Sequence, residues 1–166
     1  MDEWLNADSI DVYSFPPEAM KKLDRIFIMD VTQTFPFRDG QFEFIYCEDF
    51  MEHFDQKYGL SICAECFRTL KPGGAWRIST PDFDRIINCF ELQSRNNINF
   101  NNWNFGHKLL YSESYARLIL NRCGFKPIIR CQYGESEHAE LRGIDTRIQQ
   151  KDWSLILETT KPLLRD

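Results

Sequence analysis

The sequence contains no apolar run approaching the about 18 residues that a membrane-spanning helix needs. Its first ten residues, MDEWLNADSI, are acidic and lack the apolar core of a signal peptide. We therefore expect no membrane partner and a cytoplasmic location. The chain also has no internal repeat and no low-complexity linker. We predict one domain that covers residues 1–166.

Positive charge is scarce as well, since 20 Lys and Arg residues stand against 25 Asp and Glu residues, a formal net charge of −5. Proteins that bind nucleic acids usually carry a basic patch that follows the phosphates. The sequence shows no such patch, so we predict no nucleic-acid partner. Its 43% hydrophobic content is that of a folded globular protein.

The cysteines also lack the spacing that is typical of a disulfide-bonded scaffold. A C-x-x-C pattern, Cys63 to Cys66, falls inside a predicted helix without a nearby cation, so we interpret it as core packing. Glu135, Glu137 and His138 are too loosely spaced for a typical metal cluster, and we predict no metal site. The six cysteines lie mostly in apolar runs and are expected to be reduced thiols: Cys47, Cys63, Cys66, Cys89, Cys123 and Cys131.

Strand and helix patterns alternate along the chain. Apolar positions at intervals of three and four residues predict a helix over 58–70. A second helix is expected over 112–121, with Ser112 at its start and Gly124 after its end. Apolar runs predict strands at 4–7, 26–29, 42–47, 75–79, 126–131 and 154–160.

This order predicts an α/β fold: a doubly wound, mostly parallel sheet of at least five strands, with helices on both faces. The last two strands have no obvious helix between them, so we expect an antiparallel edge. Further helical turns are predicted from Pro16 to Leu23 and from an Asp82 cap to Leu92. The asparagine-rich segment 93–108 is either a lid over a site or a hydrophobic plug.

Acidic residues, Glu48 and Asp49, follow the predicted strand 42–47, and His53 comes shortly after them. Ligands of open α/β sheets bind at the carboxyl ends of the strands. The pattern therefore indicates a ligand site at this strand end. The alternatives are that the two acids form a solvated strand exit and that His53 packs against the following helix.

Six short motifs occur in a fixed order along the chain. Together they resemble the class I S-adenosylmethionine-dependent methyltransferases, and in particular a subgroup of small bacterial enzymes of methyltransferase type 11. The motifs are WLN-x-D (4–8), PF-x-D-x-x-F (36–42), EH (52–53), LKPGG (70–74), GHK-x-LY (106–111) and YGES (133–136).

The resemblance implies a fold, a reaction and a set of site residues. Asp8 corresponds to the acid that binds the ribose hydroxyls of S-adenosylmethionine, and Asp30 to the acid that meets the adenine amino group. Glu48 and Asp49 are implied to line the cofactor site. His53 and His107 are candidates for a general base. The implied reaction is methyl transfer to a small-molecule or sugar-type acceptor, although each of these residues could instead have a turn or packing role.

The family also has a Gly-x-Gly loop after its first strand, where only glycine allows the backbone close to the cofactor. The sequence contains no such motif. We therefore expect a fold that lacks the first strand, weak or absent S-adenosylmethionine binding, and a homo-oligomer through the N-terminal sheet edge. Three explanations stay open: a start upstream of Met1, a truncated non-catalytic binding or oligomerisation module, or a substitute loop.

Overall fold

The computed structural model of the chain describes residues 4–8, 26–88 and 106–163. The chain divides into two compact units, residues 1–36 and residues 37–166. In the first unit, β1 (Asn6–Asp8) and β2 (Ile26–Ile28) pair in parallel. Strand β2 lies within the predicted range 26–29, whereas β1 begins two residues after its predicted start and ends one residue after its predicted end. The helical turn expected from Pro16 to Leu23 lies outside the described residues.

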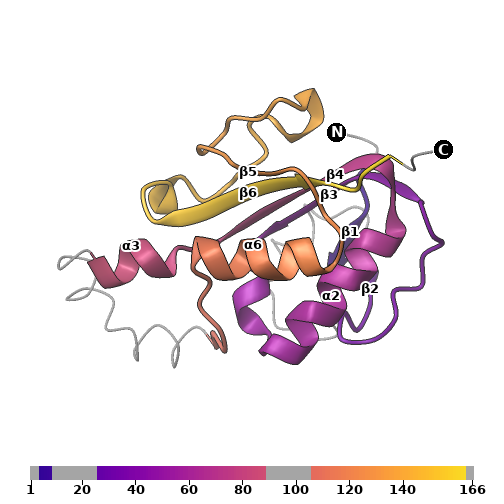
Figure 1. Cartoon of the computed structure of the whole chain (residues 1–166), viewed down its shortest axis with the longest axis horizontal. Coiled ribbons are helices and arrows are strands. Elements are labelled where there is room, and N and C mark those ends of the chain that lie inside the picture. The colour runs from indigo at the N-terminus through magenta and orange to yellow at the C-terminus, as the bar shows by residue number, and fades with distance from the viewer. Residues whose placement is uncertain (1–3, 9–25, 89–105, 164–166) are drawn as a thin grey trace. The chain divides into compact units, whose positions relative to one another are not determined.

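The second unit contains a four-stranded sheet with the order β3-β4-β6-β5 (Figure 1). Strand β3 runs parallel to β4, whereas β6 is antiparallel to both β4 and β5. The predicted α/β class with an antiparallel edge is therefore confirmed. The bounds of the strands are Phe42–Glu48 for β3, Leu70–Pro81 for β4, Ile128–Arg130 for β5 and Ser154–Thr160 for β6.

The strands form two sheets where we expected a single sheet of at least five strands. The difference follows from the pairing, because β2 bonds to β1 while the remaining four strands bond to one another. Among the described residues, β4 is the one strand neighbour of β3. Within the described ranges no strand joins β1 to β3, and the expected lack of the first strand stays a prediction.

Polar side chains fix the starts of the helices. Asp55 accepts a 3.1 Å hydrogen bond from the Tyr58 amide, which begins α2 (Gln56–Thr69) two residues before its predicted start. Ser112 caps α6 (Glu113–Arg122) in the same way, as predicted, through the Tyr115 amide at 3.2 Å. Asp82 caps α3 through the Arg85 amide at 3.2 Å. The described residues also contain α3 (Phe83–Asn88) and three short 3-10 helices, η2 (Met51–His53), η3 (Ala139–Leu141) and η4 (Ile148–Gln150).

Helices α2 and α6 cover one face of the four-stranded sheet (Figure 1). The core there is aromatic: the fully buried rings of Trp76 and Phe125 have centroids 5.6 Å apart, and Phe67 meets Phe125 edge-on at 5.0 Å. Because side chains alternate along a strand, Arg77 points to the opposite face. The connection between β5 and β6 covers that face.

The LKPGG motif belongs to β4, which begins at Leu70, five residues before the predicted strand. The pairing register shifts between Phe42 and Phe44, so the chain bulges at this point. A Cβ atom on Gly74 would lie 2.9 Å from the backbone oxygens of Glu43 and Lys71. The second glycine of the motif is therefore required by close backbone packing.

Arg77 forms a fully buried ionic cluster beneath the β5–β6 connection. Its Nε donates to Asp145 Oδ1 at 2.9 Å and its Nη2 donates to Asp145 Oδ2, while Nη1 donates to Glu158 Oε1 at 2.5 Å. The carbonyl oxygens of Gln132 and Glu135 accept two further bonds from the guanidinium. The partners of the Arg77 guanidinium lie between 55 and 81 residues away in the sequence.

We predict that Arg77→Leu lowers the free energy of unfolding by about 3–5 kcal/mol, because it leaves two buried carboxylates without a cation. Equilibrium unfolding in urea measures this change. The exposed pair Lys71–Glu43, at 2.6 Å, supplies the control, and Lys71→Met should cost less than about 1 kcal/mol. Equal losses in the two variants would contradict a dominant role for the buried cluster.

Candidate functional site

The predicted ligand site lies at the carboxyl end of β3, where Glu48 ends the strand and Asp49 follows. Asp49 has a φ of 48°, a left-handed conformation that is uncommon for a residue other than glycine. Its amide donates a 2.9 Å hydrogen bond to the Ser79 carbonyl in β4. This bond fixes the turn beside the end of the neighbouring strand. Strained backbone of this kind is often found at functional sites.

The Glu48 carboxylate binds the backbone ahead of η4. Its oxygens accept hydrogen bonds from the Thr146 amide at 3.0 and 3.1 Å and from the Arg147 amide at 3.1 Å. The Thr146 hydroxyl donates a further bond. Both oxygens are thus used to hold the β5–β6 connection against the end of β3. The cofactor role predicted for Glu48 stays a prediction.

Asp49 is less fully bonded than its neighbour. Its Oδ2 lies 3.4 Å from Nε of Arg147, while Oδ1 is buried and has no hydrogen-bond partner among the described residues. Burial raises the pKa of this carboxyl, and the positive charge of Arg147 opposes that shift. A hydrogen bond with the Gln150 side chain, in η4, opposes the pKa shift as well, so the Asp49 carboxyl lies among polar groups of the β5–β6 connection.

Glu52, in η2, is fully buried. Its Oε2 accepts a 2.8 Å hydrogen bond from the Thr80 hydroxyl, while Oε1 has no hydrogen-bond partner in the described ranges. Burial raises the pKa of the carboxyl to about 7. Within the Glu52-His53 pair the sequence predicted a role for His53 alone, and Glu52 was missed as a candidate. The pairing of an acid with a histidine was the available signal.

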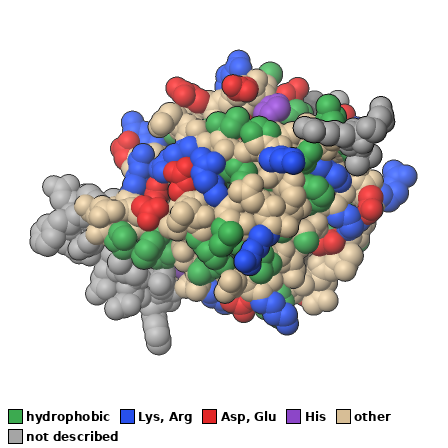
Figure 2. All heavy atoms as spheres, viewed as in Figure 1, with side chains coloured by type: hydrophobic (Ala, Val, Ile, Leu, Met, Phe, Trp, Pro, Cys, Tyr) green, Lys and Arg blue, Asp and Glu red, His purple; other side chains and the backbone are tan. Residues whose placement is uncertain are grey.

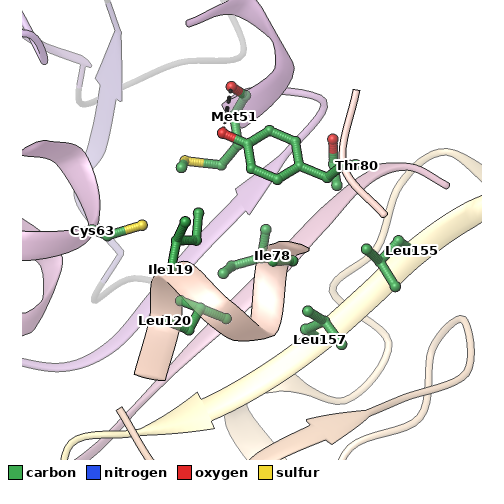
Figure 3. Close-up of a pocket in the computed structure, with 10 residues that line it drawn as sticks. Met51, Cys63, Ile78, Thr80, Ile119, Leu120, Leu155 and Leu157 are labelled. Atoms are coloured by element: carbon green, nitrogen blue, oxygen red, sulfur yellow. Dashed lines mark hydrogen bonds between the residues drawn. The ribbon is translucent and has the colours of Figure 1, made fainter. Parts of the chain in front are cut away.

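The space beneath Glu52 is apolar and small. Figure 3 shows Met51 of η2 and Thr80 of β4 at this cavity, with Cys63, Ile119 and Leu120 from the two helices. The cavity has a volume of about 10 Å³, which is room for about one water molecule. It is a packing space of the core and is too small for a cofactor.

The structure brings His53 and His107 together, with ring centroids 5.0 Å apart in an edge-to-face arrangement. The amides of Lys108 and Leu109 donate to the Glu52 carbonyl at 2.7 and 3.2 Å, which holds the 107–109 segment beside η2. Nε2 of His107 lies 3.9 Å from Oε1 of Glu52. Three chemically active side chains therefore meet at one point.

Burial is the main cause that lowers the pKa of both histidines. For His107 the positive charge of His53 acts in the same direction, whereas for His53 the Asp49 carboxylate opposes the shift. Both rings are therefore neutral near pH 7. A neutral imidazole can accept a proton or bind a metal ion.

The other two predicted site residues belong to the first unit. Asp8 is the last residue of β1 and pairs in register with Ile28, the last residue of β2. Asp30 follows β2 by two residues, so both acids lie at the carboxyl edge of one parallel strand pair. The exposed Asp30 carboxylate accepts bonds from the amide and hydroxyl of Thr32, at 2.9 and 2.6 Å. These bonds lower its pKa and keep it ionised.

Ligands of open α/β sheets bind at such strand ends. The sequence offers no Gly-x-Gly segment for the methionine end of S-adenosylmethionine. In the described residues, left-handed glycines occupy turns at Gly40, Gly124 and Gly134. The cofactor roles of Asp8, Asp30 and Asp49 stay predictions.

We predict that Thr80→Val costs about 1–3 kcal/mol of unfolding free energy, because it removes the hydrogen bond that Glu52 accepts in the core. Thermal or urea unfolding measures the loss. In a Glu52→Met background the same change should be nearly neutral, since both polar partners are then gone. An equal loss in both backgrounds would show that the hydroxyl matters for another reason.

Comparison with known proteins identifies the architecture. Residues 14–78 match a family model described as a methyltransferase domain. A solved S-adenosylmethionine-dependent methyltransferase from Thermotoga maritima is 16% identical, covers 94% of this chain and 72% of its own, and has a TM-score of 0.64. One from Archaeoglobus fulgidus is also 16% identical, covers 88% and 73%, and has a TM-score of 0.62. No curated protein sequence matches this chain.

At these identities the solved structures show a shared fold, and the family match supports the same conclusion from the sequence. The predicted resemblance to the class I methyltransferases is thus confirmed. No helix in the described part of the chain is long and apolar enough to cross a membrane. On the face shown in Figure 2, Lys and Arg side chains lie beside Asp and Glu side chains.

Proposed function

We propose that this chain, which has the fold of the class I S-adenosylmethionine-dependent methyltransferases, transfers a methyl group to a small-molecule or sugar-type acceptor. The observation that carries the proposal is the methyltransferase-domain match. The matched segment includes Asp30 after β2 and the residues Glu48 to His53 after β3, whereas His107 lies outside it. These are the strand ends at which a ligand of this fold would bind.

On the cofactor side, bound S-adenosylmethionine would supply an electrophilic methyl group on a sulfonium sulfur. Asp8 would accept hydrogen bonds from the ribose hydroxyls, and Asp30 would accept one from the adenine amino group. Asp30 is ionised and exposed, as this role requires. Hydrogen bonds to a charged carboxylate are about twice as strong as neutral ones.

On the acceptor side, a hydroxyl or amine must lose a proton as it takes up the methyl group. His53 and His107 are the proposed general bases, because each is neutral near pH 7 and only partly buried. The net negative charge of the chain supports a small acceptor over a nucleic acid. A cytoplasmic location fits such an acceptor and belongs to the proposal.

Titration calorimetry and ligand-observed NMR with S-adenosylmethionine and S-adenosylhomocysteine test the cofactor. We predict binding weaker than about 10 μM for this chain, or about −7 kcal/mol, because the sequence lacks the glycine loop. Asp8→Ala and Asp30→Ala should each weaken it by about a further 1–3 kcal/mol, since each removes a charged acceptor. Asp152→Ala, in the β5–β6 connection, is the matched control and should leave the affinity unchanged.

Absence of binding at millimolar S-adenosylmethionine would overturn the proposal in this chain. It would favour the alternative, a methyltransferase-like binding or oligomerisation module without cofactor affinity. Light scattering would then test whether the chain forms a homo-oligomer through its N-terminal sheet edge. Tight binding that neither aspartate affects would show instead that the cofactor is held by other residues.

A further inference from the structure

We propose that Glu52, His53 and His107 form a binding site for a divalent transition-metal ion of the zinc, cobalt or manganese kind. One carboxylate oxygen and one ring nitrogen from each histidine all lie within 4.8 Å of one another. Ligand atoms about 2.0–2.2 Å from a zinc ion lie about 3–3.5 Å apart. Small side-chain rotations would bring these three atoms to such distances.

The buried carboxylate oxygen is the second, independent observation. Oε1 of Glu52 is fully buried, has no hydrogen-bond partner in the described ranges, and lies 3.9 Å from Nε2 of His107. Burying a polar atom without a partner costs free energy, and nearly all such atoms in native proteins are paired. A cation between the carboxylate and the two rings would supply the missing partner.

The groups around the three side chains orient them as the supporting contacts of a metal site do. The Thr80 hydroxyl holds the other oxygen of Glu52 at 2.8 Å, which turns Oε1 toward His107. His53 is hydrogen-bonded to the Gly106 backbone. The Glu52 carbonyl in turn anchors the segment that carries His107, through two amide bonds. The three ligands are thus held in place before any ion binds.

The donor set selects the class of ion. Two imidazoles and one carboxylate suit zinc, cobalt, manganese or iron, whereas magnesium and calcium prefer oxygen ligands alone. Three protein ligands leave at least one coordination position for water or for an oxygen of a small molecule. Asp49 lies close enough for its negative charge to act on both Glu52 and His53, which adds to the attraction for a cation.

A ring nitrogen bound to a metal cannot at the same time be a free general base. A bound metal ion would therefore prevent the coordinating nitrogens of His53 and His107 from acting as general bases. Its existence does not depend on the proposed methyl transfer, because it is tested by metal binding alone. The two hypotheses can fail separately.

The test uses the full chain without an affinity tag and follows its visible absorption during titration with Co²⁺. We expect one equivalent to bind with the spectrum of nitrogen and oxygen ligands, Zn²⁺ to displace it, and Mg²⁺ at ~1 mM to leave it in place. His53→Asn, His107→Asn and Glu52→Gln should each weaken Co²⁺ binding by at least about 10–100-fold. His138→Asn is the matched control, because that ring packs on Phe44, with centroids 5.5 Å apart, and should change nothing.

Circular dichroism of each variant checks that it folds, and Glu52→Gln retains the shape of the buried side chain. Three outcomes would overturn the proposal. The first is a thiolate charge-transfer band, which would place the ion on cysteines. The second is that His138→Asn weakens Co²⁺ binding as much as the ligand variants do. The third is no binding at ~1 mM Co²⁺, which corresponds to a binding free energy weaker than about −4 kcal/mol.

Discussion

The buried contact between Arg77 and two carboxylates, Asp145 and Glu158, determines how one face of the sheet is closed. Taking three charges out of water is costly, and only a fully bonded arrangement offsets that cost. Here Asp145 also accepts the Gly134 amide at 2.8 Å. The ionic cluster thereby joins the middle of β4, the last strand and the long connection before it. A long connection whose helices are two single 3-10 turns, η3 and η4, thereby gains a fixed position.

The candidate site depends on this closure. Thr146 and Arg147 follow Asp145 directly, and their amides bind the Glu48 carboxylate at the end of β3. The next residue, Asp49, takes its left-handed turn there and starts the short path into η2. A buried arginine on one strand therefore supports the conformation from which Glu52 and His53 project, through its bonds to Asp145 and the amide bonds that Glu48 accepts.

The order of the elements in the second unit could be predicted because it rests on local signals. Asp82 and Ser112 cap helices as expected, and the apolar runs of β3 and β6 are strands. Arg77 could not be predicted, because its partners lie 68 and 81 residues away. The burial of Glu52 likewise follows from Thr80 and from the 107–109 segment, which no short sequence pattern links to it. Proximity of His53 to His107 was implied only by the family resemblance.

The buried carboxyl of Glu52 distinguishes this site from a strand end that is packed with apolar side chains alone. An apolar residue in its place would fill the core without the cost of burying a carboxyl, and buried ionisable groups are seldom needed for stability alone. The chain instead places this carboxyl against two imidazoles, beside a left-handed aspartate. Groups whose pKa is shifted by burial and that converge at a strand end are typical of functional sites. The physical cost of the arrangement thus supports the proposal that Glu52, His53 and His107 bind a metal ion.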